Sequence, residues 1–462
     1  MRHCNQGRFS QQMNFIRSQY AQADELPFGD LLSPELVDQL LAEAEVSSND
    51  CIYTPLTTLQ LFLWQVTSQD HSCRATVAKF NAHRVASGEP PCSSKTGAYC
   101  TARQRLPEVV VKGLMRETGS RLELQAPGLW KWKGRSVKVF DGSTVTMPDT
   151  AANQAEFPQQ PNQRRGLGFP IARIAAVFSL ASGAVLDAGM CRFQGKGQSE
   201  LGLLRELLHV FLPGDVMLTD RYLCSWFELA LQRGGQVDFI CRLHQARKID
   251  FPAGTNDMVV LWPKPRRPEW MDPLTYAALP SMMPVRVVRF QVDQAGFRPE
   301  WIVVATSLLD ADEVSAEDLA GLYRQRWHVE LDLRSLKQTL QMDILRCKEP
   351  ELVRKELWTH LLAYNLVRGV MAQAALQHRV FPRELSFKGA LQILTAFQPQ
   401  LEHADAHRLT SLYRAILAGI AQHRVGDRPN RVEPRARKRR PKPYPLLTKP
   451  RAEAKRVLAA RT

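Results

Sequence analysis

Residues 136–144 have the sequence SVKVFDGST, and this stretch decides the fold that we predict for the chain. Residues 136–140 are rich in Val and Phe, as a short β-strand is, and Asp141 follows them directly. Before this stretch the apolar pattern is helical, and after it strands and helices alternate. The stretch therefore marks the start of an α/β domain whose first strand ends on a carboxylate.

The segments that follow continue the α/β pattern. We predict strands at 171–180, 183–190, 215–219, 237–243 and 301–306, and helices at 200–212, 225–233 and 315–340. Three strands that can form hairpins, then a helix, then a strand, is the order of an RNase H-like core of the retroviral-integrase type. Residues 244–299 are rich in Pro and Gly and fit that core poorly, so we interpret them as a β-rich insertion.

Four regions follow from these patterns. They are a helical N-terminal domain (1–130), an α/β catalytic domain with its insertion (131–345), a helical region (346–423) and a basic, Pro-rich tail (424–462). The N-terminal helices carry Arg103, Arg105, Lys112 and Arg116, which indicates a basic side. DNA binding and an ordinary solvated helix face both explain such a side.

The charge balance indicates a polyanionic partner. The chain has 61 Lys and Arg against 46 Asp and Glu, a formal net charge of +15. Residues 424–456 alone hold thirteen Lys or Arg and three acids, and prolines interrupt the densest run, Arg435 to Lys442. Such a segment cannot form a core and is typical of an extended arm that binds nucleic acid or another anion.

Composition also excludes several classes of protein. No apolar stretch approaches the roughly 20 residues that span a bilayer, and the N-terminus has no signal-peptide apolar region. The nine cysteines are odd in number and contain no C-x-x-C pair, which argues against a disulfide framework and a structural zinc site. We therefore expect a cytosolic protein with no membrane partner.

Three acids stand where metal-dependent chemistry would need them. Asp141 and Asp220 each end a predicted core strand, and Glu330 lies on the predicted helix 315–340. Carboxylates at strand ends can converge on one edge of a sheet, and Mg²⁺ or Mn²⁺ prefers such oxygen ligands. The alternative is that each Asp simply caps a turn.

One face of the predicted helix adds to the argument. Tyr323, Arg326, Glu330 and Lys337 follow one another at steps of three, four and seven residues, which stay on one helical face. A carboxylate that holds metal beside cations that neutralise phosphate oxygens suits a scissile phosphodiester. An exposed face with an ordinary Arg326–Glu330 ion pair has the same spacing.

These residues resemble a known family. The pattern Tyr323-x2-Arg326-x3-Glu330-x6-Lys337 is similar to the Y-R-E-K signature of insertion-sequence family four, a group of bacterial DDE transposases. Residues 141–144, DGST, resemble its first Asp motif, and Asp220-Arg221-Tyr222 resembles its second. Many members have Gly where this chain has Tyr222. The resemblance covers roughly residues 132–377.

The resemblance implies a site. Asp141, Asp220 and Glu330 would bind two divalent ions, Mg²⁺ or Mn²⁺, which activate water or a DNA 3′-OH and stabilise the leaving oxygen. Tyr323, Arg326, Lys337 and Arg221 would then bind phosphates near the cut. Trp301, on the strand before the helix, would stack an extruded base. The alternative for Trp301 is an aromatic of the core at a strand end.

It also implies a function. The protein would cut DNA at the ends of an insertion sequence and transfer the strands to target DNA, by cut and paste through a hairpin intermediate. DNA ends and target DNA would be its partners, a homodimer would hold two ends, and the site of action would be the bacterial cytoplasm at the nucleoid. Two alternatives stay open: an RNase H-like metal-dependent nuclease, and a non-catalytic DNA-binding regulator of transposition.

Overall fold

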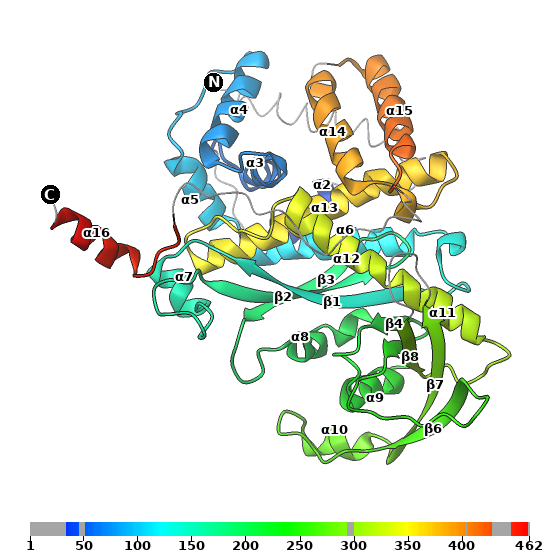
Figure 1. The fold of residues 1–462 in the computed structure, drawn as a ribbon. Helices are drawn as coiled ribbons and strands as arrows, with labels where there is room; N and C mark the ends of the chain where they lie inside the picture. The colour runs from blue at the N-terminus through cyan, green and yellow to red at the C-terminus, as the bar shows by residue number, and fades with distance from the viewer. Residues whose placement is uncertain (1–33, 46–50, 293–299, 403, 427–444, 461–462) are drawn as a thin grey trace. The chain divides into compact units, whose positions relative to one another are not determined.

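The structure is a computed structural model that describes residues 34–45, 51–292, 300–402, 404–426 and 445–460 (Figure 1). The basic run from Arg435 to Lys442 lies outside these residues. The chain divides into two compact units, and each is described by itself. Unit 1 comprises Met1–Gly134, Phe178–Ala188 and His328–Val425, and unit 2 comprises Arg135–Val177, Gly189–Trp327 and Gly426–Thr462.

The strands form one eight-stranded sheet in the order β3-β2-β1-β4-β5-β8-β7-β6 (Figure 1). Their bounds are β1 Val137–Thr146, β2 Ile171–Ser179, β3 Val185–Arg192, β4 Val216–Thr219, β5 Asp238–Arg242, β6 Asp257–Pro263, β7 Met282–Val292 and β8 Glu300–Thr306. The neighbours β1, β4 and β5 run parallel, whereas β8 runs antiparallel to β5. Only five residues join β2 to β3, which makes them an antiparallel hairpin, because a parallel connection needs a dozen or more. The protein is thus a mixed α/β protein, as the sequence predicts.

The segment 244–299, which we interpret as a β-rich insertion, contributes two strands to this same sheet. Its two strands, β6 and β7, pair with each other and β7 pairs with β8, all antiparallel. Strand β7 pairs with the edge of β8 that β5 does not occupy, and the side chains of Val285 and Val287 on β7 are buried. The segment is thus rich in β-strand, as the sequence predicts, and its two strands extend the core sheet.

Strand β1 is longer than predicted. We expected it to end at Asp141, but it continues to Thr146, so Asp141 lies inside the strand. Residues 141–144 resemble a turn by composition, yet β2 lies alongside β1 as its hydrogen-bonded neighbour and gives the backbone of this part a partner. The β-branched residues from Thr144 to Thr146 favour a strand as well.

Unit 2 also contains helices, some of which contact the sheet. They are α7 (Ala151–Glu156), α8 (Glu200–Glu206), the 3₁₀ turn η2 (Leu208–Val210), α9 (Trp226–Gly234), α10 (Pro273–Ala278), α11 (Ala316–Gln325) and α16 (Arg451–Ala459). Helix α8 contacts β1, α9 contacts β5, and α11 contacts β5 and β7. The C-terminal tail was expected to be extended, but α16 makes part of it helical.

The predicted helix 315–340 is present with two irregularities. It begins where we expected, at a capping box formed by Ser315 and Asp318. It is interrupted at Arg326, resumes as α12 (Trp327–Arg334), and ends in a π-helical turn at Ser335–Thr339. The expectation of one regular helix to residue 340 was therefore wrong.

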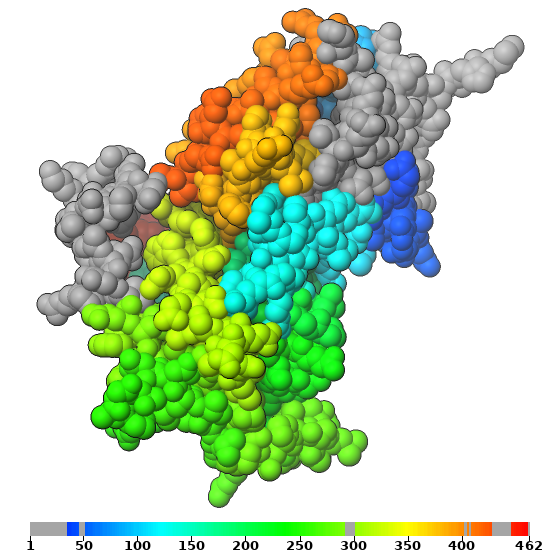
Figure 2. Space-filling view, turned by 90° about the vertical axis from the view of Figure 1, so that its right-hand side faces the viewer, coloured from blue at the N-terminus to red at the C-terminus, as the bar shows by residue number. Residues whose placement is uncertain are grey.

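Unit 1 is helical and is organised around one long helix. Its helices are α2 (Pro34–Glu43), α3 (Pro55–Thr67), α4 (Cys73–Ala86), α5 (Gly97–Arg105), α6 (Glu108–Leu124), α13 (Pro350–Gln377), α14 (Phe387–Glu402) and α15 (Ala406–Gln422), with 3₁₀ turns η1 (Gly128–Trp130) and η4 (Pro382–Glu384). Helix α13 is buried almost all round because α3, α5, α6, α14 and α15 pack against it. The space-filling view shows α6, in cyan, beside the later, gold part of this unit (Figure 2). No helix in the described part of the chain is both long and apolar enough to cross a bilayer.

Two details of unit 1 differ from the sequence prediction. The helical stretch predicted at 387–423 is two helices, and the Asp405 side chain caps the second by accepting from the Arg408 backbone N–H at 2.8 Å. Arg103, which we counted on a basic side, is only 5% exposed. Its guanidinium donates to the thiols of Cys73 (3.2 Å) and Cys347 (3.7 Å). It therefore belongs to the core rather than to a DNA-binding face.

The buried His71 and His360 make unit 1 sensitive to acid. The pKa of His71 is lowered to about 4 and that of His360 to about 3, mainly by burial and in part by the positive charge of Arg346. Above the ordinary value of 6.5 both histidines are neutral in the folded and unfolded chain, so they do not affect stability. As the pH falls from 6.5 to about 4, only the unfolded chain takes up the protons, and stability is lost.

We therefore expect the free energy of unfolding of unit 1 to fall between pH 7.5 and pH 4.5, by up to about 3 kcal/mol per histidine. Urea unfolding at the two pH values measures this change. His360→Gln should remove a large part of the difference, because glutamine does not titrate. An identical pH dependence in the variant and the unaltered chain would refute the assignment.

Candidate active site

Strands β1 and β4 bring two of the predicted acids together. The strands pair in parallel with Val137 opposite Val216 and Val139 opposite Leu218, a constant offset of 79 residues. Continued by two residues beyond the last pair, the same offset would place Asp141 opposite Asp220, which directly follows β4, and the charge of Asp220 does act on Asp141. Neighbouring strands lie about 4.8 Å apart, so the two carboxylates stand side by side near the carboxyl end of β4. The 79 residues that separate Asp141 from Asp220 in the sequence therefore equal the offset between paired residues of β1 and β4.

Asp220 is held by the turn that follows β4. Its Oδ1 accepts the backbone N–H groups of Tyr222 at 2.9 Å and Leu223 at 3.3 Å. Both bonds end on the same oxygen, so they orient the carboxylate without using Oδ2. Arg221 and Tyr222 are exposed. The Tyr at position 222, where Gly is common in the family, is therefore accommodated by pointing its ring to solvent.

Asp141 has the electrostatic environment of a group that needs a cation. Burial raises its pKa to about 6, and the carboxylates of Asp220 and Glu200 act in the same direction. The Gly142 N–H, which donates to Oδ1 at 2.8 Å, and the Arg326 guanidinium lower it without cancelling the rise. Neighbouring carboxylates that disfavour one another's charge become favourable when a divalent cation lies between them. These oxygen donors fit Mg²⁺ or Mn²⁺.

Glu200, the first residue of α8, is a member of this group that the sequence did not indicate. Its side chain lies so close to Gly142 that a Cβ there would be 2.7 Å from the Glu200 Cδ. Its Oε1 accepts from the Arg173 Nη1 at 2.7 Å. A larger residue at position 142 would thus force the Glu200 side chain to shift. The glycine that directly follows Asp141 was the feature of the sequence that could have indicated a close neighbour at this position.

Two of the four residues predicted on one helical face lie beside the aspartates in unit 2. Tyr323 on α11 is 7% exposed, and burial raises its pKa to about 12. Arg326 ends α11, and its Nη1 lies 3.9 Å from Asp141 Oδ2. The Tyr323 hydroxyl is therefore neutral at physiological pH and can donate a hydrogen bond, while Arg326 supplies a positive charge next to the carboxylates.

The other two belong to unit 1. Glu330, on α12, and Lys337, in the π-helical turn, are both half-buried and both have partners. The wider π turn means that the seven-residue step between them does not follow an ideal α-helical face. Among the described residues no three His, Cys, Asp or Glu side chains form a group that could hold a metal ion. That Glu330 binds the same metal ions as Asp141 and Asp220 therefore stays a prediction.

Trp301 is not a core residue. It lies on β8, is 53% exposed, and its ring carries the Arg289 guanidinium at 5.0 Å from the ring centroid. The same guanidinium lies 4.8 Å from the Phe251 ring centroid and donates from Nε and Nη2 to Asn256 Oδ1. The alternative of a buried aromatic at a strand end is thus excluded. The indole of Trp301 is exposed and makes a cation–π contact with the Arg289 guanidinium.

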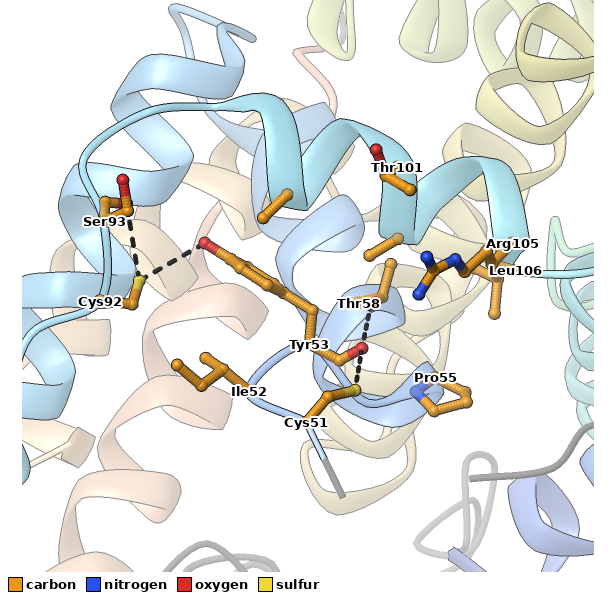
Figure 3. A pocket seen from close by; sticks show the side chains of 12 residues that line it. Cys51, Ile52, Tyr53, Pro55, Thr58, Cys92, Ser93, Thr101, Arg105 and Leu106 are labelled. Atoms are coloured by element: carbon orange, nitrogen blue, oxygen red, sulfur yellow. Dashed lines mark hydrogen bonds between the residues drawn. The ribbon is translucent and has the colours of Figure 1, made fainter. Parts of the chain in front are cut away.

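Unit 1 also contains a pocket of about 470 Å³, which is lined by none of the predicted site residues (Figure 3). It is lined by residues 51–58, at the start of α3, and by residues of α5 and the segment before it. The hydroxyl of Tyr53 and the thiol of Cys92 are 3.4 Å apart in its wall. It contains none of the residues predicted to hold metal ions or phosphate, so it is not the candidate site.

The fold and the site define a class: a mixed α/β protein with two carboxylates paired on parallel strands. Comparison with known proteins gives the family. The family described as "Transposase DDE domain" matches residues 132–366, half of the chain. The chain belongs to this transposase family, in the group of insertion-sequence family four.

Relatives support this membership. The transposase InsG for insertion sequence element IS4 of Escherichia coli (strain K12) is 27% identical over 446 residues, which cover 91% of this chain and 93% of InsG. The transposase for insertion sequence element IS421 of Escherichia coli is 43% identical over 70 residues, 15% of this chain and 19% of that protein. A solved structure, the piggyBac transposase synaptic complex with hairpin DNA, has a TM-score of 0.42 and 10% identity, and covers 84% of each chain.

Proposed function

We propose that this transposase cuts DNA at the ends of an insertion sequence and joins those ends to target DNA with divalent metal ions held by Asp141, Asp220 and Glu330. The strand order β3-β2-β1-β4-β5, with β1, β4 and β5 parallel, supports an RNase H-like core as the scaffold. Bound Mg²⁺ or Mn²⁺, two ions in this proposal, would supply a nucleophilic oxygen and stabilise the leaving oxygen.

The register of β1 and β4 is the observation that carries the proposal. It makes Asp141 and Asp220 neighbours, and the raised pKa of Asp141 indicates that the site gains from added positive charge. A protein that only binds DNA would gain nothing from buried carboxylates beside the phosphate backbone, since they repel it. The same features therefore favour catalysis over a purely regulatory role.

The cations and the phenol around the acids would hold the DNA. Arg326 lies close enough to Asp141 to neutralise a phosphate oxygen at the metal site, and exposed Arg221 directly follows Asp220. The neutral Tyr323 hydroxyl would donate to a phosphate oxygen, and Lys337 would contact a phosphate further along the strand. These roles would bind and position the scissile phosphodiester beside the carboxylates of Asp141 and Asp220.

We also propose a hairpin intermediate, with Trp301 as the platform for an extruded base. Its exposed indole is available for stacking, and the Arg289 guanidinium that lies over it would be displaced by a base or would stack alongside one. Closing a hairpin at a DNA end forces bases out of the helical stack, and a partner for such a base lowers the cost.

Trp301→Ala should slow hairpin formation about tenfold, because base stacking on an aromatic side chain is worth roughly 1–3 kcal/mol. First-strand nicking of the same DNA should keep its rate. Denaturing gels of a labelled element-end duplex separate the two products. Trp270→Ala is a matched control, since Trp270 is 44% exposed and also carries a guanidinium, that of Arg205. Equal loss of nicking and hairpin in Trp301→Ala would rule out the stacking role.

One experiment separates the proposal from its alternatives. Purified protein is incubated with Mg²⁺ and a duplex that carries the element end, with Glu330→Ala in parallel. Hairpin or joined product from the unaltered protein alone supports transposition. Nicking without either product points to a metal-dependent nuclease, and binding without cleavage leaves only a DNA-binding regulator.

Assembly and organisation are further parts of the proposal. Synapsis of two element ends requires two active sites, so a homodimer on DNA is the expected state, at the nucleoid of a bacterial cell. The boundaries 1–130, 131–345, 346–423 and 424–462 stay predictions about domains. The compact units divide the chain differently, between Trp327 and His328 within the long helical segment.

A further inference from the structure

A buried ionic cluster in unit 1 is centred on Asp332 of α12, which is 1% exposed. Arg383 donates to it twice, from Nη1 to Oδ1 at 2.9 Å and from Nη2 to Oδ2 at 2.8 Å. The Arg368 Nη2 of α13 also donates to Oδ1, and the Tyr364 hydroxyl lies 3.0 Å from the same oxygen. One carboxylate thus receives two guanidiniums and a phenol away from solvent.

The tip of the β2–β3 hairpin closes over this cluster. The Tyr364 hydroxyl lies 3.0 Å from the Gly183 carbonyl oxygen. Gly183 has a φ of +78°, and a Cβ there would overlap the Arg383 guanidinium and lie 2.9 Å from the Arg368 Cζ. Glycine is required at this position both for the backbone conformation and for the close approach. Segments near residues 183, 332, 364 and 383 therefore meet at one acid.

Helix α12 depends on such an anchor because of its ends. It has only eight residues, is separated from α11 at Arg326, and passes into the π-helical turn at Ser335. The backbone at Arg326 and at Arg334 stays in the right-handed helical region, so both turns continue the helical path, but a segment this short has little stability of its own. Side-chain contacts must therefore set the direction in which its residues point.

Asp332 and Glu330 are coupled through that rotation. Two residues along an α-helix correspond to about 200°, so the two acids project from nearly opposite sides of α12. Because Arg368 and Arg383 hold Asp332, α12 cannot rotate about its axis. The direction in which Glu330 projects from the helix is then fixed as well. Buried ion pairs seldom add much net stability, and their best-attested use is to select a single arrangement.

We infer that Asp332, with Arg368 and Arg383, is a positioning residue that aims Glu330 at the metal site. The inference rests on the proposed role of Glu330 as a metal ligand. Residues that orient metal ligands through hydrogen bonds affect metal affinity or activity about 10–100-fold when they are changed. Removing the Asp332 charge should therefore weaken metal use more than DNA binding.

The test is cleavage of an element-end duplex by Asp332→Asn over a range of Mn²⁺ concentrations. The half-saturating Mn²⁺ concentration should rise about tenfold or more. The affinity for the duplex, measured without metal, should stay within about twofold of the unaltered protein, because none of these side chains is proposed to touch DNA. If Asp332→Asn does not fold, Arg383→Lys replaces it in the test. This variant keeps the positive charge but loses the paired hydrogen bonds, so the half-saturating Mn²⁺ concentration should rise by a smaller factor.

Asp187→Asn is the matched control. Asp187 is also a buried acid of unit 1, 1% exposed, and its Oδ2 pairs with Arg116 at 2.7 Å, but it lies on β3 rather than on α12. It should lower the urea midpoint without changing the half-saturating Mn²⁺ concentration. The inference is overturned if Asp332→Asn behaves in the same way.

Glu330→Gln separates this inference from the proposed function. If that variant cleaves normally at all Mn²⁺ concentrations, Glu330 is not a metal ligand and the proposed function itself is wrong in this respect. If it is inactive while Asp332→Asn and Arg383→Lys both keep the ordinary half-saturating Mn²⁺ concentration, the proposed function stands and only the positioning role is lost.

Discussion

Asp220→Asn should abolish cleavage of element ends, with a loss of at least about 10³-fold, equivalent to roughly 4 kcal/mol of barrier. The substitution keeps the size of the side chain and an oxygen that can accept from the Tyr222 and Leu223 N–H groups, so the turn after β4 should keep its shape. It removes one of two neighbouring negative charges that would bind a divalent ion. Single-turnover cleavage measures the loss, and a DNA mobility-shift assay should show unchanged binding.

Asp238→Asn provides the control for that result. Asp238 is the first residue of β5, which runs parallel to β4. It therefore lies at the amino ends of these strands, whereas Asp220 follows the carboxyl end of β4. It pairs with Arg135 at 2.6 Å, so its substitution should affect stability but leave cleavage within a few-fold of the unaltered protein. Retention of cleavage by Asp220→Asn would remove Asp220 from the site, and an equal loss in Asp238→Asn would show that the assay reports folding.

Gly119→Ala should destabilise unit 1 by about 2–3 kcal/mol, although alanine is the better helix former. Gly119 lies inside α6, and a Cβ there would overlap the Val185 carbonyl oxygen and lie 3.1 Å from the Leu186 Cα. The same carbonyl accepts a hydrogen bond from Asn365 Nδ2 at 2.8 Å, so it cannot move without breaking that bond. The urea midpoint, followed by tryptophan fluorescence, should fall accordingly.

Gly97→Ala is the comparison for that substitution. Gly97 begins α5 in the same unit, and a Cβ there would meet nothing within 4 Å. The same chemical change should therefore alter stability by less than about 1 kcal/mol. A Gly119→Ala protein as stable as Gly97→Ala would mean that α6 and the β2–β3 hairpin do not pack as closely as described.

Local patterns in the sequence predicted most elements correctly because their causes are local. Ser315 with Asp318 marks a helix start through short-range hydrogen bonds, and the predicted start at residue 315 is confirmed. Errors occurred where a distant segment decides the outcome. Strand β1 passes through Asp141 because β2 lies beside it, and the long helix is broken at Arg326, for which no Pro or Gly in the sequence gives a warning.

The site shows the same division. Asp141 and Asp220 could be predicted because each directly follows a short run of apolar or β-branched residues. The role of Glu200 could not, since it depends on the approach of α8 to Gly142, 58 residues away in sequence. Asp332 resembles an ordinary helix charge until Arg368 and Arg383 fold against it. Trp301 had two interpretations; its exposure excludes the core aromatic, and base stacking stays a prediction.

The central claim is that Asp141, Asp220 and Glu330 hold the metal ions of one site, and replacing a ligand oxygen with sulfur tests it most directly. The measurement is cleavage of an element-end duplex by Glu330→Cys in Mg²⁺ and in Mn²⁺. A thiolate binds Mg²⁺ poorly and accepts Mn²⁺ more readily. We predict that the variant is inactive in Mg²⁺ and recovers cleavage in Mn²⁺, while the unaltered protein is active in both. Normal cleavage by Glu330→Cys in Mg²⁺ would contradict the claim, because Glu330 would then not be a ligand.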